Sequence, residues 1–216
     1  MSGSLRLVHC TLATILVAVA PAAWSLGDAP APIPNGQQTP DAQAKLLYNA
    51  GIDVLRRADS THPSEEARSL YSIALGKFES AVRIDPKMHE AWNYVGYTHR
   101  RLGDYDEALQ AYERALDLQP GYPEAIEYRA EAYLALKRVA DAEQSYLDLF
   151  ATHRDVAGKL LEAMKSWITA QRSAATTGAA SDATAVNDLE KWVQERAQIA
   201  RQTASLTREG AAATWQ

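Results

Sequence analysis

The sequence of 216 residues contains a single cysteine, Cys10, which excludes disulfide scaffolds, zinc–thiolate sites, iron–sulfur clusters and a cysteine nucleophile. Its 11 glycines and 9 prolines are too few for a glycine- or proline-rich repeat protein. Only 2 phenylalanines accompany 10 tyrosines and 5 tryptophans, so most aromatic side chains carry a polar tip. The sequence also lacks the phosphate-binding, dinucleotide-binding and nucleophile-elbow motifs of common enzymes. We therefore predict that the protein is not an enzyme.

A basic surface is also missing. The chain has 22 Lys and Arg residues against 27 Asp and Glu residues, which gives a formal net charge of −5 and an isoelectric point near 5.6. Proteins that bind nucleic acids normally show a basic face that offsets the phosphate charge, so we expect no nucleic-acid partner. Hydrophobic residues at 47% and charged residues at 23% are typical of a folded globular protein rather than a disordered chain.

The histidines do not form a metal-binding motif. His89 and Glu90 begin like the helix of a zinc protease, but Asn93 stands where the second histidine is required. We expect His99 to pack between helices rather than to bind a metal. The sequence therefore predicts neither a metal nor a cofactor.

The first residues have the order of a targeting segment. Arg6 precedes an apolar run at 10–20, and small residues follow it. This order is typical of a secretory signal peptide, and the run is shorter than the roughly 20 residues that cross a bilayer. We expect residues 1–25 to be a signal peptide, cleaved after Ala22 or Ser25 or else kept as an anchor. After cleavage no stable membrane span is expected, and the protein would be periplasmic or secreted.

Residues 26–42 contain four of the nine prolines. Such a segment cannot bury a core, so we predict a flexible linker. A proline-rich ligand for another domain is the alternative.

A 34-residue period follows the linker. Pro86 and Pro120 are 34 residues apart, and these prolines are expected to end helices. The same offset relates Ala74, Ala108 and Ala142; Phe78, Tyr112 and Tyr146; Trp92 and Ile126; Gly96 and Ala130; and His99 and Tyr133.

The residue types in this period have physical reasons. Gly96, Ala108 and Ala115 are small where paired helices are expected to approach closely. Gly103 is expected to end one helix in a left-handed conformation. We expect the side chain of Asp104 to cap the next helix by accepting amide hydrogens.

With this period and these residues, the segment 89–120 resembles a tetratricopeptide repeat, a helix–turn–helix unit of 34 residues. It departs from the family pattern mainly at Val95 and His99, where the family usually has leucine and tyrosine. The resemblance implies an all-α, TPR-type α-solenoid of about four antiparallel helix pairs with a degenerate C-terminal pair.

The period also predicts the limits of the units. Residues 43–154 are expected to hold three repeats, at about 43–88, 89–122 and 123–154, with about 11 extra residues in the first. A degenerate fourth helix pair is expected at 155–207, with a loop at 174–184. Residues 208–216 are expected to form a flexible tail, on which Trp215 is either part of a disordered end or a short anchor.

In the tetratricopeptide family, the opening helix of each unit faces a concave surface that holds a peptide or a partner helix. The resemblance therefore implies a partner-binding groove. Its candidate residues are Tyr48 and Ile52 in the first unit; Asn93, Tyr94, Tyr97, Arg100 and Arg101 in the second; and Glu124, Glu127, Tyr128 and Glu131 in the third.

The resemblance does not extend to the carboxylate clamp of repeats that grip chaperone tails. Tyr48 and Ile52 stand where that clamp needs lysine and asparagine, and Glu124 and Tyr128 stand where it needs two cations.

Two interpretations of the three groove glutamates are open. They form a solvated face whose charge Arg100 and Arg101 balance, or they contact basic residues of a partner while the tyrosines stack against it. The resulting hypothesis is a non-catalytic adaptor or assembly factor in the cell envelope that binds another protein. The alternatives are a structural subunit that forms a homo-oligomer through Trp167 and Trp192, and an accessory subunit of a periplasmic enzyme complex.

Overall fold

The computed structural model describes residues 39–61, 63–176 and 182–213, with side chains described as far as 206. These residues lie within one compact unit, Gln38–Gln216, and form eight α-helices without a strand. The helices are α1 (Pro40–Ser60), α2 (Glu65–Ile84), α3 (His89–Leu102), α4 (Tyr105–Leu118), α5 (Pro123–Ala135), α6 (Val139–Thr152), α7 (Arg154–Thr176) and α8 (Ala183–Ala213). The predicted all-α fold is confirmed.

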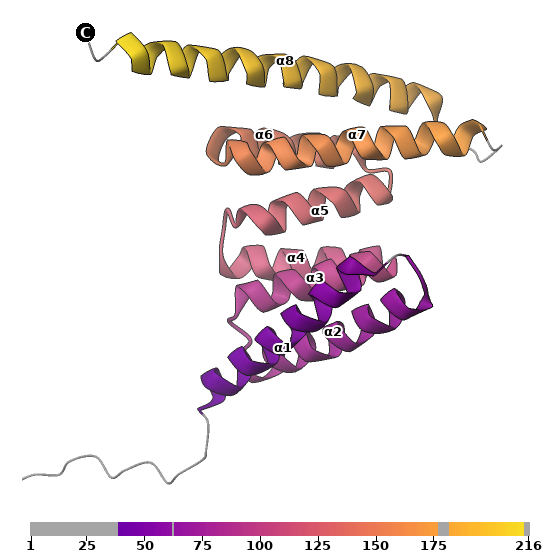
Figure 1. The fold of residues 1–216 in the computed structure, drawn as a ribbon, viewed down its shortest axis with the longest axis vertical. Helices are drawn as coiled ribbons and strands as arrows, with labels where there is room; N and C mark the ends of the chain where they lie inside the picture. Colours follow the sequence, from indigo (N-terminus) through magenta and orange to yellow (C-terminus); the bar gives the residue numbers. More distant parts are fainter. Residues whose placement is uncertain (1–38, 62, 177–181, 214–216) are drawn as a thin grey trace, which may run out of the picture. The chain divides into compact units, whose positions relative to one another are not determined.

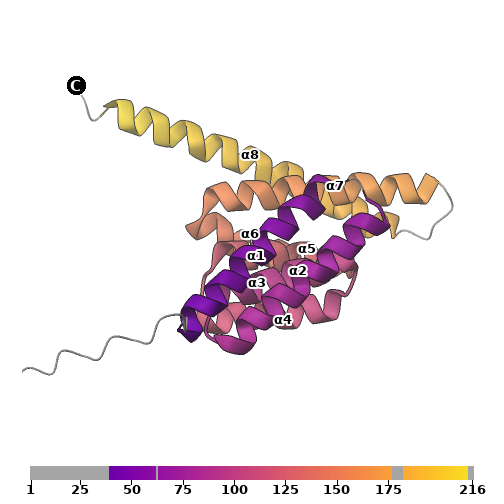
Figure 2. The ribbon, with the colours of Figure 1, turned by 60° about the horizontal axis from the view of Figure 1, so that its bottom comes forward.

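Consecutive helices pack against one another from α1 to α8, and α5 also contacts α3 and α7 (Figures 1 and 2). The second and third units follow the predicted repeat register, because α3 starts at His89 and α5 starts at Pro123, 34 residues later. This arrangement is that of a tetratricopeptide-type solenoid, in which each unit covers the apolar face of the next. Within the described residues, no helix is long and apolar enough to span a bilayer.

Local signals account for the helix ends. The Thr39 side chain accepts a hydrogen bond from the Ala42 amide at 3.3 Å, and Ser64 accepts one from the Ala67 amide at 3.2 Å. Gly103 ends α3 with φ at +95°, as predicted. The prediction for Asp104 is wrong, because its side chain makes no capping hydrogen bond. Its Oδ2 instead lies 3.5 Å from His99 Nδ1.

Two glycines allow paired helices to approach closely. A Cβ atom on Gly96 would lie 2.6 Å from Cε1 of Tyr112, and one on Gly51 would lie 2.6 Å from Cε1 of Phe78. Both distances are far shorter than ordinary van der Waals contact, so the aromatic ring occupies the space of the missing side chain in both pairs.

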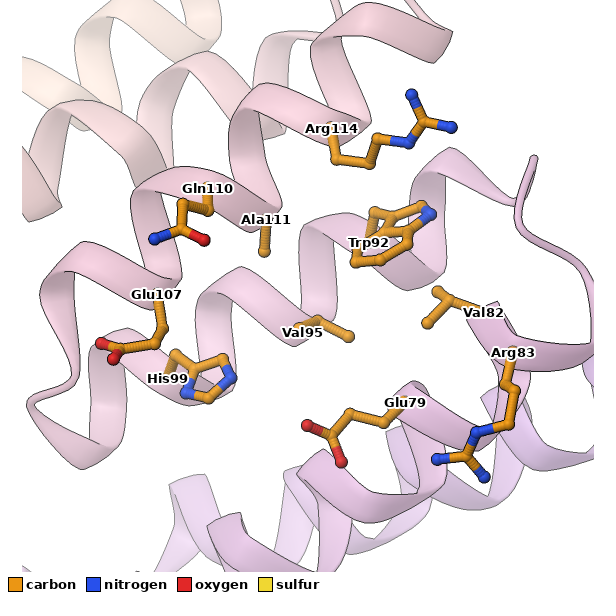
Figure 3. Close-up of a pocket in the computed structure, with 10 residues that line it drawn as sticks. All are labelled: Glu79, Val82, Arg83, Trp92, Val95, His99, Glu107, Gln110, Ala111 and Arg114. Atoms are coloured by element: carbon orange, nitrogen blue, oxygen red, sulfur yellow. The ribbon is translucent and has the colours of Figure 1, made fainter.

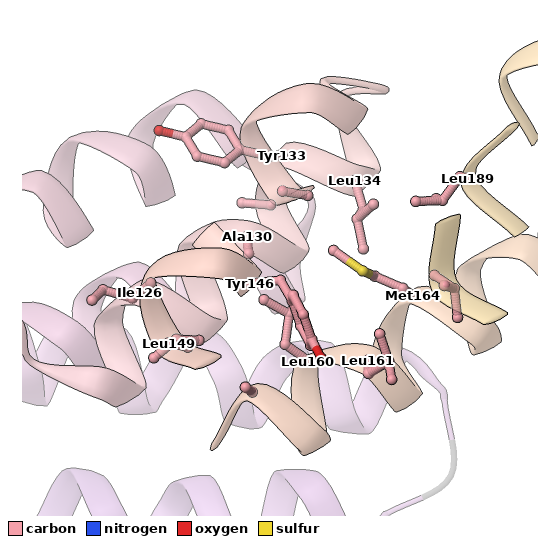
Figure 4. Packing of buried hydrophobic residues seen from close by; sticks show 14 of the residues in the cluster. Ile126, Ala130, Tyr133, Leu134, Tyr146, Leu149, Leu160, Leu161, Met164 and Leu189 are labelled. Atoms are coloured by element: carbon pink, nitrogen blue, oxygen red, sulfur yellow. The ribbon is translucent and has the colours of Figure 1, made fainter. Parts of the chain in front are cut away.

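The apolar core consists of two clusters. One surrounds Phe78 and draws on α1 to α4, and the other extends from α4 to α8. Figure 4 shows the second cluster, in which Tyr146, Leu160 and Met164 lie close together. Trp167 and Trp192 pack against this same cluster, although the sequence suggested them as a surface for self-association.

The structure shifts several of the expected limits. α1 begins at Pro40, so its first turn takes the end of the expected linker 26–42, while the signal peptide and residues 26–38 lie outside the described residues. α7 and α8 extend into the expected loop 174–184 from both sides. Residues 208–213 are helical rather than a flexible tail, in keeping with the high helix propensity of alanine. Trp215 lies outside the described residues.

Candidate functional site

Four tyrosines from α1, α3 and α5 form a continuous series of ring contacts. The ring centroids of Tyr48 and Tyr94 are 5.8 Å apart, those of Tyr94 and Tyr97 are 6.2 Å apart, and those of Tyr97 and Tyr128 are 5.1 Å apart. All three contacts are steeply inclined or edge-to-face, the arrangement that aromatic pairs prefer. Each ring is partly exposed. We call this surface, Tyr48, Tyr94, Tyr97 and Tyr128, the tyrosine face.

Buried rings support the tyrosine face from below. Phe78 stacks on Tyr94 at 5.3 Å, and Tyr112 lies 6.5 Å from Tyr128. Burial raises the pKa of Tyr48 to about 12 and raises the pKa values of Tyr94 and Tyr97. These hydroxyls therefore keep their protons at neutral pH and can donate hydrogen bonds.

Asp59, near the end of α1, joins this face to two helices. Its Oδ1 accepts hydrogen bonds from the hydroxyls of Tyr71 at 2.7 Å and Tyr97 at 3.0 Å. The same oxygen lies 3.1 Å from Nη1 of Arg101, which also donates to the Tyr97 hydroxyl at 3.0 Å. The Arg101 guanidinium lies 4.7 Å from the Tyr71 ring centroid. Asp59 thus neutralises one of the two predicted groove arginines.

Arg100 is neutralised by a second acid. Its guanidinium carbon lies 5.2 Å from the Tyr97 ring centroid and 5.7 Å from that of Tyr128. Its Nη1 donates to Oε2 of Glu131 at 2.6 Å, and these side chains are only 14% and 26% exposed. Both arginines on this side of α3 therefore have acidic partners within the chain, as the charge-balanced interpretation expects.

Glu127 differs from Glu131, because it is buried without a cationic partner at hydrogen-bond distance. It is 7% exposed and makes no ion pair within the described residues. Burial raises its pKa to about 7, the nearby Glu131 adds to this shift, and Lys159 opposes it. A solvated glutamate is therefore the wrong description of this position.

The structure separates the remaining candidates. Glu124 is partly exposed on α5 and makes no ion pair within the described ranges. Ile52 is half-buried and packs against the core cluster around Phe78. Asn93 is 1% exposed, and its side-chain amide finds no hydrogen-bond partner among the described residues. Asn93 therefore lies in the interior and not on the predicted binding surface.

Asp59 is the residue of this candidate site that the sequence did not reveal. It lies at the start of the insertion of about 11 residues in the first unit, outside the 34-residue register. No metal site accompanies it, since the described part of the chain contains no cluster of three or more His, Cys, Asp or Glu residues that could hold an ion.

The tetratricopeptide repeat model matches residues 63–123 and 96–155. RNA polymerase II-associated protein 3 of Rattus norvegicus is 35% identical over 103 residues, and the protein of the same name from Homo sapiens is 32% identical over 103. These alignments cover 48% of this chain and 15% of each relative, so the chain matches only a small part of their length.

Three solved structures of other proteins resemble parts of the chain. The NMR structure of the first TPR domain of human RPAP3 is 18% identical, with a TM-score of 0.48, and covers 59% of this chain and 96% of that one. The first TPR of Spaghetti (RPAP3) bound to the HSP90 peptide SRMEEVD is 16% identical, with a TM-score of 0.47. That match covers 57% of this chain and 92% of the other chain. MamA is 16% identical, with a TM-score of 0.47, and the match covers 77% of this chain and 88% of MamA.

Tetratricopeptide repeats are generally non-catalytic modules for protein interaction. The family model matches the part of the chain, 63–155, that has the 34-residue register and the paired helices. Residues 63–155 of the chain are therefore tetratricopeptide repeats.

Proposed function

We propose that this chain is a non-catalytic protein-binding module that holds a segment of a partner protein against the tyrosine face. The observation that carries the proposal is the series of four partly exposed tyrosine rings across α1, α3 and α5. Tyrosine and arginine dominate the binding energy of many protein interfaces, because they combine a large apolar area with polar tips. Rings that are already held in place lose little entropy on binding.

The charges around these rings favour a basic segment. Arg100 and Arg101 are occupied by Glu131 and Asp59, whereas Glu124 has no cationic partner among the described residues. An incoming lysine or arginine would pair with Glu124 without breaking an internal ion pair. An acidic segment would have to displace Glu131 or Asp59 from its arginine. We therefore propose a partner segment that contains lysine or arginine.

We also propose that the protein acts outside the cytoplasm, as an adaptor or assembly factor of the cell envelope. The support is the order of residues 6–25, in which a positive residue, an apolar run and small residues follow one another. Fractionation of cells that express the full chain, with mass spectrometry of its N-terminus, tests this proposal. A full-length chain in the cytoplasmic fraction would contradict it.

Cross-linked pull-down tests the binding proposal. The wild-type chain is expected to capture a partner that Tyr94→Ala/Tyr97→Ala/Tyr128→Ala loses. Tyr105→Ala, which removes a partly buried tyrosine of α4 outside this face, is the control and should retain the partner. Equal capture by the triple variant would place the interface elsewhere. Capture of nothing except the chain itself would favour the self-associating subunit.

A charge reversal tests the chemistry of the partner without altering the rings. Glu124→Lys should weaken binding of the captured partner at least about fivefold, because it opposes a basic segment. The peptide SRMEEVD is the acidic probe, and we expect it to bind the wild-type chain weakly or not at all. Tighter binding of SRMEEVD than of the captured partner's own binding segment would contradict this part of the proposal.

A further inference from the structure

A cavity of about 680 Å³ lies between α2, α3 and α4 (Figure 3). Apolar side chains line its centre: Val82 of α2, Trp92 and Val95 of α3, and Ala111 of α4. The Trp92 indole is fixed, because its Nε1 donates a hydrogen bond to the Pro86 carbonyl at 3.0 Å. We call this space the α2–α4 cavity. Its volume lies within the range of about 300 to 1,000 Å³ that is usual for ligand sites.

Charged groups of opposite sign lie at its two ends. Figure 3 shows the carboxylates of Glu79 and Glu107 toward one end, and the guanidinium groups of Arg83 and Arg114 toward the other. An occupant with a cation at one end and an anion at the other would match this arrangement.

Most of these charges are unpaired in the part of the chain that the structure describes. Glu79, Arg83 and Glu107 make no ion pair within the described residues, and Arg114 only approaches Asp117, with Nη1 3.9 Å from Oδ2. All four are exposed, so each is hydrated in the free protein. They are therefore available to an occupant without the cost of breaking a close internal pair.

In the next repeat, different residues stand at the positions that correspond to the lining of this cavity. Thirty-four residues after Val95 stands Arg129, whose Nε is buried and whose guanidinium lies 5.6 Å from the Tyr133 ring centroid. A long side chain thus replaces the short one of Val95. The counterparts of Arg83 and Arg114 are Asp117 and Asp148, so the positive end is absent there.

We propose that the α2–α4 cavity is a second protein-docking site, which takes a segment with an apolar side chain between a basic and an acidic residue. The apolar side chain contacts Trp92 and Val95, the basic residue pairs with Glu79 and Glu107, and the acidic residue pairs with Arg83 and Arg114. Trp92 and Val95 lie on the side of α3 opposite Tyr94 and Tyr97, given 100° per helical residue. The site is therefore distinct from the tyrosine face and does not depend on its function.

The probe is the capped tripeptide acetyl-Lys-Leu-Glu-amide, since a cavity of this size accommodates roughly three extended residues of about 3.3 Å each. The readout is the Trp92 indole N–H signal in a ¹⁵N–¹H correlation spectrum of the full chain, assigned by its loss in Trp92→Phe. We expect a saturable shift with a Kd on the order of 1 mM. The neutral peptide acetyl-Gln-Leu-Gln-amide should bind at least about fivefold more weakly.

Two variants change the site in defined ways. Val95→Arg copies Arg129 of the next repeat, so it should fill the cavity and abolish the shift while the helical circular dichroism is retained. Arg114→Glu makes one end acidic, and it should transfer the preference from acetyl-Lys-Leu-Glu-amide to acetyl-Lys-Leu-Lys-amide. Arg68→Glu makes the same charge change on α2 outside the cavity lining and should leave the preference unchanged.

Several results would overturn the proposal. They are the absence of a Trp92 shift at about 10 mM probe, an equal response to the charged and neutral peptides, and an unchanged response in Val95→Arg. Tyr94→Ala/Tyr97→Ala is expected to leave the Trp92 shift intact, which separates this site from the tyrosine face. A shift lost in that variant and retained in Val95→Arg would assign the probe to the tyrosine face instead.

Discussion

Charged side chains are paired on one side of α3 and largely unpaired on the other. On the tyrosine face, Arg100 and Arg101 are held by Glu131 and Asp59, and their guanidinium groups lie over tyrosine rings. Around the α2–α4 cavity, Glu79 and Arg83 have no ion-pair partner among the described residues. The difference arises from the neighbouring helices, since α1 and α5 supply acids to one side of α3 and α2 and α4 leave the other side open.

This contrast separates charges that stabilise the fold from charges that remain available to a ligand. Removing one member of a partly buried pair leaves its partner without compensation, which destabilises the protein. Removing an exposed, unpaired charge has little effect on folding. Stability measurements on variants can therefore distinguish the two surfaces without knowledge of any partner.

The largest loss of stability is expected at Gly96, where α3, which contributes to both surfaces, packs closely against α4. Gly96→Val places a side chain where even a Cβ would lie 2.6 Å from Tyr112, so it should destabilise the chain by about 3 kcal/mol. Chemical denaturation followed by circular dichroism measures this loss. Gly76→Ala is the control, since a Cβ there meets nothing within 4 Å, and it should stabilise α2 by about 0.5 to 1 kcal/mol. Equal destabilisation by both substitutions would contradict the close approach of α3 and α4.

Arg100→Met tests the paired side of the contrast. It leaves Glu131 partly buried without its partner, and we expect a loss of about 2 kcal/mol in the free energy of unfolding. Lys165→Met is the matched control, because it breaks the exposed pair with Glu162 and should cost less than about 0.5 kcal/mol. If the two variants are equally stable, the Arg100–Glu131 pair is not a structural element.

Glu127→Gln should stabilise the protein at pH 8 but not at pH 4.5. Because the folded-state pKa is raised from 4.5 to about 7, the unfolded chain releases this proton first as the pH rises, and wild-type stability falls between these values. The variant should therefore be about 1 to 2 kcal/mol more stable than the wild type at pH 8, and nearly equal to it at pH 4.5. Denaturation at both pH values measures this, and a difference independent of pH would exclude titration as its cause.

The smallest effect is expected at the open side. Glu79→Gln and Arg83→Gln should each change the free energy of unfolding by less than about 0.5 kcal/mol, because neither side chain has an ion-pair partner among the described residues. Thermal and chemical denaturation are both suited to this measurement. A loss near that of Arg100→Met would show that these charges stabilise the fold, and the contrast between the two surfaces would fail.

The repeat register predicts the parts of the molecule that depend on local spacing. It predicts that paired helices approach closely at Gly96, where the structure places the Tyr112 ring, and it predicts the starts of α3 and α5. It also brings Tyr94, Tyr97 and Tyr128 to one face, because they are on opening helices of successive units. The regular spacing of residues along each helix and from one repeat to the next is enough to predict these features.

Features that depend on distant contacts could not be predicted in this way. Asp59 lies in an insertion without a counterpart in the other units, so only the folded chain shows that it meets Tyr97, 38 residues away. Asn93 follows Trp92 on an opening helix and still lies in the interior. The α2–α4 cavity depends on the short side chain of Val95, whose meaning appears only beside Arg129 in the next unit.

The position of Asp59 also bears on how the chain unfolds. In a solenoid, each helix pair is held mainly by its neighbours, so the ends can open independently. Asp59 links α1, α2 and α3 through Tyr71, Tyr97 and Arg101, so the first two helix pairs are expected to open as one cooperative unit. Native-state amide exchange should then be similar in α2 and α3 and faster at residues 201–206 of α8, most of which are exposed. Limited proteolysis of the folded chain would therefore be expected to cut within the last described turns of α8 before it cuts within α2 or α3.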